Sequence, residues 1–171
     1  MSLSMYDVSV PVFRQILEGM IGVLDKAEAH CTEVGVDHAE WISGKLAEDM
    51  FPFSFQIMLM GMHSAGAIKV LRGQTYERPS GLETFAGCKA AVLADIAALD
   101  AVKPADLEGS DVRDVVFTSP GGSIPFVGRD YLLTFALPNF YFHAATAYDI
   151  LRHKGLGIGK RDFLGPVKRK E

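Results

Sequence analysis

The sequence predicts an all-α fold, namely a single bundle of four long helices with one short extra helix and a small β-hairpin before the last helix. Apolar residues recur at spacings of three and four along four long segments, and two short β-favouring runs flank one turn-forming stretch. No repeat, linker or low-complexity tract divides the 171 residues. We therefore expect one domain over 1–171, with a loop-like tail from about residue 157.

The first half of the chain contains two of the long helices and the short one. The first long helix is expected over 4–31. Its apolar residues recur at helical spacing: Val8, Val12, Ile16, Met20, Val23 and Ala27. Gly35 ends this segment, and a short helix capped by Asp37 follows. A second long helix, with Asp49 placed to cap it, is expected to continue to about Leu71.

The second half contains the other two long helices and the hairpin. The third helix is expected over 82–102. Its apolar stripe consists of Phe85, Cys88, Val92, Ile96 and Leu99. The β-favouring runs 112–117 and 123–127 flank a Pro-Gly-Gly turn, which predicts a hairpin. The last helix is expected over about 128–153, and Pro138 inside it predicts a kink.

Composition narrows the classes of partner. The formal net charge of −4 gives no general attraction to nucleic acid, and no run of about eighteen apolar residues predicts a membrane span. The N-terminal residues lack the basic flank and apolar core of a signal peptide, so we expect a cytoplasmic protein. Cys31 and Cys88 are the only cysteines, and we expect both to be inert thiols in a reducing compartment.

A row of polar residues lies on the otherwise apolar last helix. Asn139, His143 and Thr146 are four and three residues apart, so they share one face. Burying such groups without partners is costly, which makes them informative. His143 is either a core histidine bonded within the bundle, a ligand-binding or catalytic residue, or a metal ligand. In a bundle, His63 of the second long helix can face His143 across the core.

The metal interpretation is weak on chemistry. A zinc or nickel site needs at least three protein ligands, commonly histidine and carboxylate. No HxxxH, HExxH or ExxH motif occurs, so a third ligand would have to be Asn139, Asp49 or Tyr141. We therefore expect no bound metal and no other cofactor; if zinc or nickel did bind, its ligands would be His143 and His63.

Short segments along nearly the whole chain share the pattern of one known family. They lie at 3–6, 10–13, 46–52, 130–133, 137–143, 151–153 and 162–165. These segments resemble the bacterial DUF1993 family of uncharacterised proteins, and the most specific is the stretch from Pro138 to His143. That family is similar to the wider DinB/YfiT-like superfamily.

The resemblance implies an up-down-down-up four-helix bundle that is often dimeric, so we expect a homodimer. Members of the superfamily commonly bind a divalent metal through three histidines, one on the second helix and an HxxxH pair on the last. On that pattern His143 stands for one histidine of the last helix and His63 for that of the second. Ala147 and Asn139 occupy the neighbouring turns, where the remaining histidine would lie.

Three hypotheses follow for function. The leading one is a protein that binds a small molecule in a cleft lined by His143, Asn139, Tyr141 and His63, without a complete metal triad. The first alternative is a divalent-metal-dependent hydrolase or thiol transferase with an atypical site, as some members of the superfamily are. The second is a non-catalytic dimer in which aromatic surface residues pair two bundles. Whether the protein is an enzyme is left open by the sequence.

Overall fold

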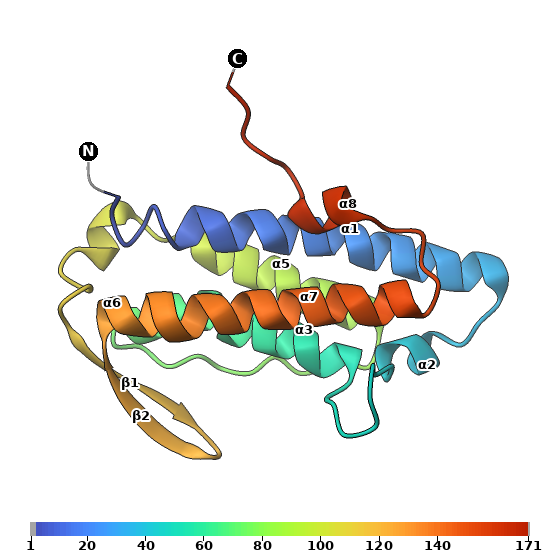
Figure 1. Ribbon diagram of the computed structural model, residues 1–171, viewed down its shortest axis with the longest axis horizontal. Coiled ribbons are helices and arrows are strands. Elements are labelled where there is room, and N and C mark those ends of the chain that lie inside the picture. Colours follow the sequence, from blue (N-terminus) through green and yellow to red (C-terminus); the bar gives the residue numbers. More distant parts are fainter. Residues whose placement is uncertain (1–2, 171) are drawn as a thin grey trace.

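The computed structural model describes residues 3–170 and is mostly helical (Figure 1). The elements in chain order are α1 (Val10–Val34), α2 (His38–Ile42), α3 (Phe53–Met62), α4 (Ala65–Leu71), α5 (Phe85–Asp100), the 3-10 turn η1 (Pro104–Leu107), β1 (Asp114–Ser119), β2 (Gly122–Val127), α6 (Gly128–Asp130), the π-helical segment η2 (Tyr131–Ala136), α7 (Leu137–His153) and α8 (Lys160–Leu164). Within residues 3–170 no helix is both long and apolar enough to cross a bilayer.

The four long helical stretches form an up-down-down-up bundle, which confirms the predicted fold. α1 and α7 run in one direction, whereas α3 and α5 run in the other (Figure 1). α1 packs against α5, and α3 packs against α7. Because α4 and α5 are connected across the full length of the bundle, the segment 72–84 runs along its side without forming a helix or a strand. We call this segment the strap.

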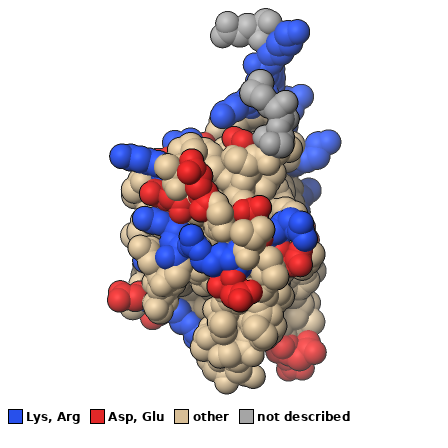
Figure 2. All heavy atoms as spheres, turned by 90° about the vertical axis from the view of Figure 1, so that its left-hand side faces the viewer, with Lys and Arg blue, Asp and Glu red and all other residues tan. Residues whose placement is uncertain are grey.

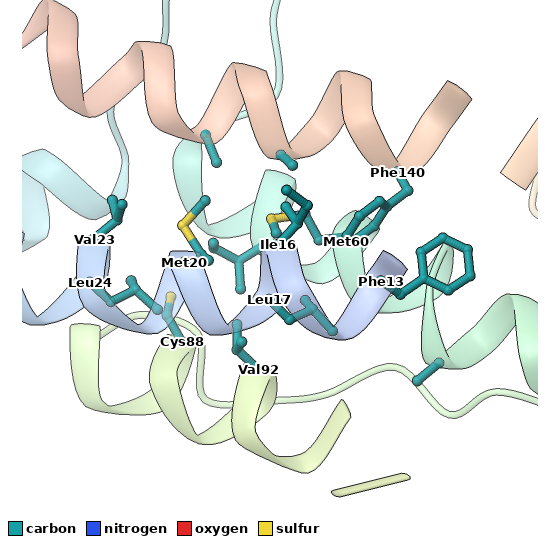
Figure 3. Packing of buried hydrophobic residues seen from close by; sticks show 14 of the residues in the cluster. Phe13, Ile16, Leu17, Met20, Val23, Leu24, Met60, Cys88, Val92 and Phe140 are labelled. Atoms are coloured by element: carbon teal, nitrogen blue, oxygen red, sulfur yellow. The ribbon is translucent and has the colours of Figure 1, made fainter. Parts of the chain in front are cut away.

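The core forms because each long helix turns one apolar stripe inward. α1 contributes side chains at spacings of three and four, and these meet α5 on one side and α7 on the other (Figure 3). Phe13 and Phe140 join α1 to α7 by an edge-to-face contact with ring centroids 4.9 Å apart. Each fully buried side chain of this size stabilises the fold by roughly 1.5–3 kcal/mol.

The second long helix differs from the prediction. It was expected to be continuous from Asp49 to Leu71, but α3 ends at Met62 and α4 begins at Ala65. At this break the Ser64 hydroxyl donates a hydrogen bond to the Met60 carbonyl (2.7 Å), a contact that often bends helices. The expected cap is also wrong, since Pro52 occupies the N-cap position and no side chain caps α3. As a result, His63 lies at the break between two helices.

The last long helix contains a π-helical segment just before Pro138. Residues 131–136 form this wider turn, and α7 continues from Leu137 to His153. A proline ring in a regular α-helix clashes with the carbonyl one turn earlier, and a wider turn relieves that clash. At the position where a kink was predicted, the structure has a π-helical segment that continues directly into α7.

The hairpin is present but longer than predicted. Its strands span 114–119 and 122–127, and Ser119 pairs with Gly122, so only Pro120 and Gly121 form the turn. Gly122 has a φ of 126°, which a residue with a side chain rarely adopts, and this allows the short turn. β1 places the buried Phe117 against the bundle.

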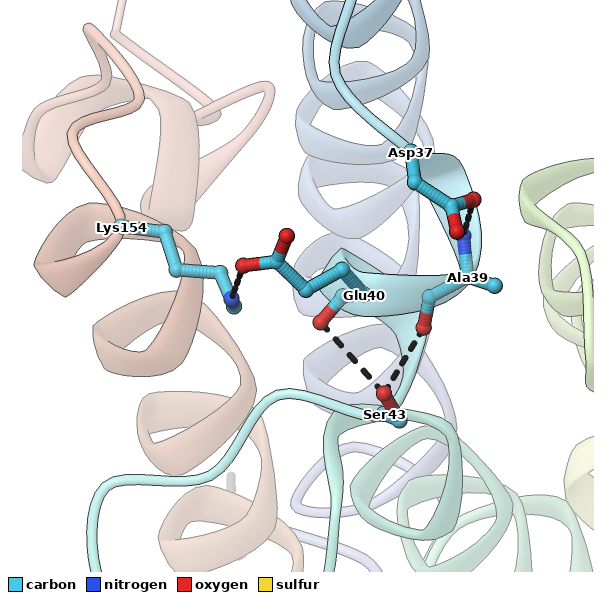
Figure 4. A network of polar contacts seen from close by, with 5 residues as sticks. All are labelled: Asp37, Ala39, Glu40, Ser43 and Lys154. Atoms are coloured by element: carbon cyan, nitrogen blue, oxygen red, sulfur yellow. Dashed lines mark hydrogen bonds and ion pairs between the residues drawn. The ribbon is translucent and has the colours of Figure 1, made fainter.

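The N-terminal end of the short helix, with Asp37 as its cap, was predicted correctly. The Asp37 carboxylate accepts a hydrogen bond from the Ala39 N–H at 2.9 Å (Figure 4). α2 ends at Ile42, and the Ser43 hydroxyl donates to the Ala39 carbonyl. Glu40 pairs with Lys154 at 3.3 Å, which ties α2 to the end of α7 (Figure 4).

The C-terminal tail was expected to be loop, and it contains one further helix. α8 spans Lys160–Leu164 and packs on α1 (Figure 1). Gly19 of α1 makes this approach possible, because a Cβ there would lie 2.6 Å from the Phe163 carbonyl oxygen. This contact lies on the α1 side of the molecule, away from the hairpin.

Candidate functional site

His63 and His143 are brought together between α3 and α7. Their rings are nearly parallel, with an interplanar angle of 14° and centroids 5.6 Å apart. His63 is 4% exposed and His143 is 9% exposed. The break after α3 places His63 at the end of its helix, whereas His143 lies within α7. We call these residues the histidine pair.

A hydrogen-bond chain orients His143. Its Nδ1 lies 2.8 Å from Oε1 of the buried Gln56, and the Gln56 Nε2 donates to the Phe51 carbonyl at 3.0 Å. Because the amide nitrogen of Gln56 donates to that carbonyl, its oxygen must accept from the histidine. His143 therefore carries its proton on Nδ1 when neutral, and its Nε2 is the free acceptor.

His63 has no such support. Its Nδ1 is buried and has no hydrogen-bond partner among the described residues. The ring is surrounded by aromatic groups, with Phe117 stacked at 5.7 Å, Phe135 edge-on at 5.5 Å, and His143 on a further side. A buried polar atom left unpaired costs about 1–3 kcal/mol. The hydroxyl of Tyr131, whose ring packs on the same Phe117 and Phe135, is likewise buried without a partner among the described residues.

Burial keeps both imidazoles uncharged at neutral pH. Loss of solvation lowers the pKa of His143 to about 4. It also lowers the pKa of His63 to about 4, with a smaller contribution from the neighbouring His143. A base of such low pKa abstracts protons poorly at pH 7. Both rings are therefore neutral hydrogen-bonding groups at pH 7.

The other residues of the expected cleft do not join this pair. The Asn139 side-chain amide donates to the Phe135 carbonyl at 2.8 Å, and the hydroxyl of Thr146, which belongs to the polar row but not to the expected cleft, donates to the Phe142 carbonyl at 2.7 Å. Both side chains are thereby satisfied by their own helix. Tyr141 is 40% exposed and lies on a different face of α7.

Gln56 was not among the expected site residues, although it bonds His143 directly. The signal that could have found it is its place on an otherwise apolar helix, seven residues before His63. A spacing of seven places two side chains on the same helix face, so both face α7.

The donor set does not fit the three-histidine metal site implied by the superfamily. Among residues 3–170, no group of three or more histidine, cysteine, aspartate or glutamate side chains is placed to hold a metal ion. The polar partner of His143 is the Gln56 carboxamide, and a carboxamide is a weak ligand for zinc or nickel. We therefore derive no chemistry through a metal.

A second buried polar pair lies on the other side of α3, and sequence reasoning missed it. Asp95 of α5 is buried, and the Tyr76 hydroxyl of the strap donates to its Oδ1 at 3.2 Å. Asp95 lies seven residues after Cys88 and four before Leu99, within the apolar stripe of its helix. That position of a carboxylate was the signal that could have identified it.

Two glycines make room for this second pair. A Cβ on Gly61 would overlap both the Asp95 carboxylate and the Tyr76 hydroxyl, and a Cβ on Gly66 would press on the Tyr76 ring at 2.9 Å. Burial raises the pKa of Asp95 to about 6, against the opposing effects of the Tyr76 hydrogen bond and Lys69. Tyr76 therefore fastens the strap to the bundle through a hydrogen-bonded carboxylate.

Neither cysteine is a candidate nucleophile. Cys31 and Cys88 are both buried. Burial raises the pKa of Cys88 to about 12 and also raises the pKa of Cys31. Because the thiolate is the reactive form, both thiols are unreactive near neutral pH.

Comparison with known proteins agrees with the fold. The family model described as "Domain of unknown function (DUF1993)" matches residues 5–164. A crystal structure of a DinB family member protein from Shewanella denitrificans is similar to this chain, with a TM-score of 0.86 and 28% sequence identity. That alignment covers 97% of this chain and 94% of the other. Comparison with curated proteins finds no match.

Proposed function

We propose a function from the site itself, because the chain belongs to the DUF1993 family, which is described as a domain of unknown function. The proposed function is the binding of a small molecule at the histidine pair, without a complete metal triad. The observation that carries this proposal is the buried, unpaired Nδ1 of His63. A ligand that hydrogen-bonds to this ring would remove the cost of leaving it unpaired.

The surroundings of His63 argue against a purely packing role. Its neighbours Phe117 and Phe135 are apolar, so a phenylalanine at position 63 would fill the same space without an unpaired nitrogen. His143, by contrast, is held in one orientation by Gln56. One imidazole is thus held by its hydrogen bond to Gln56, and the other offers a buried nitrogen to which a ligand could hydrogen-bond.

The chemistry of the pair favours an uncharged ligand. Both imidazoles are neutral at pH 7, so they offer hydrogen bonds but no charge for an anion. The aromatic rings of Phe117 and Phe135 provide an apolar surface beside the imidazoles. We therefore propose a small molecule with an apolar body and a neutral polar group such as a hydroxyl or an amide.

Ligand-induced thermal shifts test this proposal. A panel of uncharged metabolites is screened against the unaltered protein, His63→Phe, His143→Ala and the exposed control His153→Ala, which lies on the same helix as His143. We expect a compound that stabilises the unaltered protein and His153→Ala but has no effect on His63→Phe or His143→Ala. A shift that persists in His63→Phe would rule out the proposal, as would a panel without any stabilising compound.

We also propose that the protein pairs as a homodimer through exposed aromatic side chains. Phe142 of α7 is 59% exposed, and Phe51, which precedes α3, stacks on Phe55 at a centroid distance of 4.1 Å while remaining exposed itself. Exposed aromatic groups are enriched at protein interfaces. Sedimentation at micromolar concentration tests this: we expect a dimer that Phe142→Glu converts to monomer, and a monomeric unaltered protein contradicts it.

A further inference from the structure

A cleft lies beside the strap, on the face of the bundle next to the hairpin. Its volume is about 180 Å³, and it is formed by α4, the strap and β1. Met62, Val70 and Phe117 supply apolar surface. Tyr76, Arg78 and Thr118 supply polar groups. An apolar surface with a few convergent polar groups is the usual composition of a small-molecule site.

The strap wall of this cleft is held in place by Tyr76. The Tyr76 ring packs on Gly66, and its hydroxyl bonds the buried Asp95 behind the cleft. A segment without helix or strand has few backbone hydrogen bonds of its own, so such an anchor restricts its motion. Lys69 also lies over the Tyr76 ring, 5.8 Å from its centroid. The cleft is therefore a formed feature of the fold.

Arg78 determines the charge of the cleft. It is the one charged side chain that lines the cleft, and its guanidinium has no ion pair or hydrogen bond with any residue in 3–170. Asp95 lies behind Tyr76 and does not line the cleft. An unpaired guanidinium is well matched to a carboxylate, which it can bind through two parallel hydrogen bonds.

The end of the molecule that carries the hairpin has a mixed distribution of charge. Figure 2 shows one end of the molecule, where basic and acidic side chains are interspersed and form no large patch of a single sign. The lower part of that face, which includes the hairpin, carries few charged groups (Figure 2). A single exposed arginine without an ion pair, at a cleft whose lining is half polar and half apolar, thus favours a small anion with an apolar part over a highly charged polymer.

We propose that this cleft binds a small monocarboxylate, a short aliphatic or aromatic acid, at a second site that is separated from the histidine pair by the Phe117 ring. Arg78 binds the carboxylate at the mouth, and Val70 and Phe117 contact the apolar body. Thr118 provides a further hydrogen-bonding group at the rim of the cleft.

An NMR titration with benzoate and hexanoate tests the site, with benzamide as the neutral analogue of benzoate and benzylamine as the cationic one. We expect saturable shifts of amides in the strap and β1, with benzoate binding at least tenfold more tightly than benzamide and benzylamine showing no binding. Arg78→Gln should weaken benzoate binding at least tenfold. Arg161→Gln, which changes an exposed arginine on α8, should leave it unaltered.

Two further variants separate the possible outcomes. Val70→Phe fills the cleft and should abolish binding of both acids while Arg78 remains in place. His143→Ala removes the site of the proposed function and should leave the benzoate titration unchanged. The two proposals can therefore be refuted independently of each other. The proposal is overturned by equal binding of benzoate and benzylamine, by an Arg78→Gln variant that binds like the unaltered protein, or by the absence of saturable shifts.

Discussion

The histidine pair and the Asp95–Tyr76 pair are both polar groups buried on opposite sides of α3, yet burial changes their pKa values in opposite directions. It lowers the pKa of both imidazoles to about 4 and raises that of the Asp95 carboxyl to about 6. The cause is the same in each case, because the interior disfavours the charged form of any group. The charged form of histidine is the protonated one, whereas the charged form of aspartate is the deprotonated one.

The two pairs also differ in hydrogen bonding. The Tyr76 hydroxyl satisfies Asp95, and the two glycines of α3 and α4 provide the space for that bond. His63 has a buried nitrogen with no partner. A satisfied pair stabilises the connection that it joins, while an unsatisfied one lowers stability unless a ligand completes it. This contrast explains why we assign the first pair to structure and the second to binding.

The largest expected effect is acid destabilisation through the histidine pair. Because both folded pKa values lie below the ordinary value of 6.5, stability is complete above about pH 6.5 and is lost as the pH falls toward 4. The loss is about 3 kcal/mol per histidine. Urea unfolding at a series of pH values measures it, with His153→Ala as control. Constant stability across this window would contradict the assignment of two neutral buried histidines.

Removal of the oriented imidazole is expected to cost about half as much as protonation of both histidines. His143→Ala leaves Oε1 of Gln56 without its donor and opens a cavity between α3 and α7. We expect a loss of about 3 kcal/mol, measured by urea unfolding at pH 7.5. The double variant Gln56→Leu/His143→Leu should recover part of this loss, since neither partner is then left unpaired. A loss below about 1 kcal/mol would show that the hydrogen bond contributes little.

Neutralising the Asp95 carboxylate should raise the stability of the fold, whereas the changes above lower it. The folded pKa of Asp95, about 6, lies above its ordinary value of 3.8, so the folded protein loses stability as the pH rises through this window. Asp95→Asn can still accept from Tyr76 and carries no buried charge, so it should stabilise the fold by about 1–2 kcal/mol at pH 7.5. The gain should disappear at pH 4. If the variant is destabilised at pH 7.5, the ionised carboxylate contributes more than its desolvation costs.

The smallest expected effect is that of His63→Phe. It removes the unpaired nitrogen and keeps an aromatic ring against Phe117 and Phe135, so we expect a gain of about 1 kcal/mol at pH 7.5. In the same variant, the drop in stability between neutral and acid pH should be about half of that in the unaltered protein. Thermal melts at pH 7.5 and 5 measure both effects. A large loss of stability instead would mean that His63 has a partner in solution.

Much of the fold could be predicted because its signals are local. The apolar stripe of α1 and the cap of Asp37 depend on residues close in sequence, and the hairpin follows from a Pro-Gly-Gly turn between β-favouring runs. The break at Ser64 and the helix α8 were not predicted. The break involves a side-chain hydrogen bond that competes with the backbone ladder. The helix α8 depends on its contact with the distant helix α1, as at Gly19.

The candidate site was predicted only in part. His143 and His63 were expected to be able to meet, and the structure brings them together. Asn139 shares a face with His143, but it bonds its own helix, a local option that spacing does not exclude. Asp95 was overlooked, although a carboxylate within an apolar stripe is visible in the sequence.

The sequence by itself determined the helices, the bundle class and the two histidines, because the period of apolar residues and the presence of rare polar groups are properties of short stretches. Only the tertiary structure decided that His63 is unpaired, that His143 is oriented by Gln56, and that Asp95 is bonded to Tyr76. The physical reason is that burial and hydrogen-bond partners arise from residues far apart in the chain. Each of these features depends on how α3 packs between its neighbours.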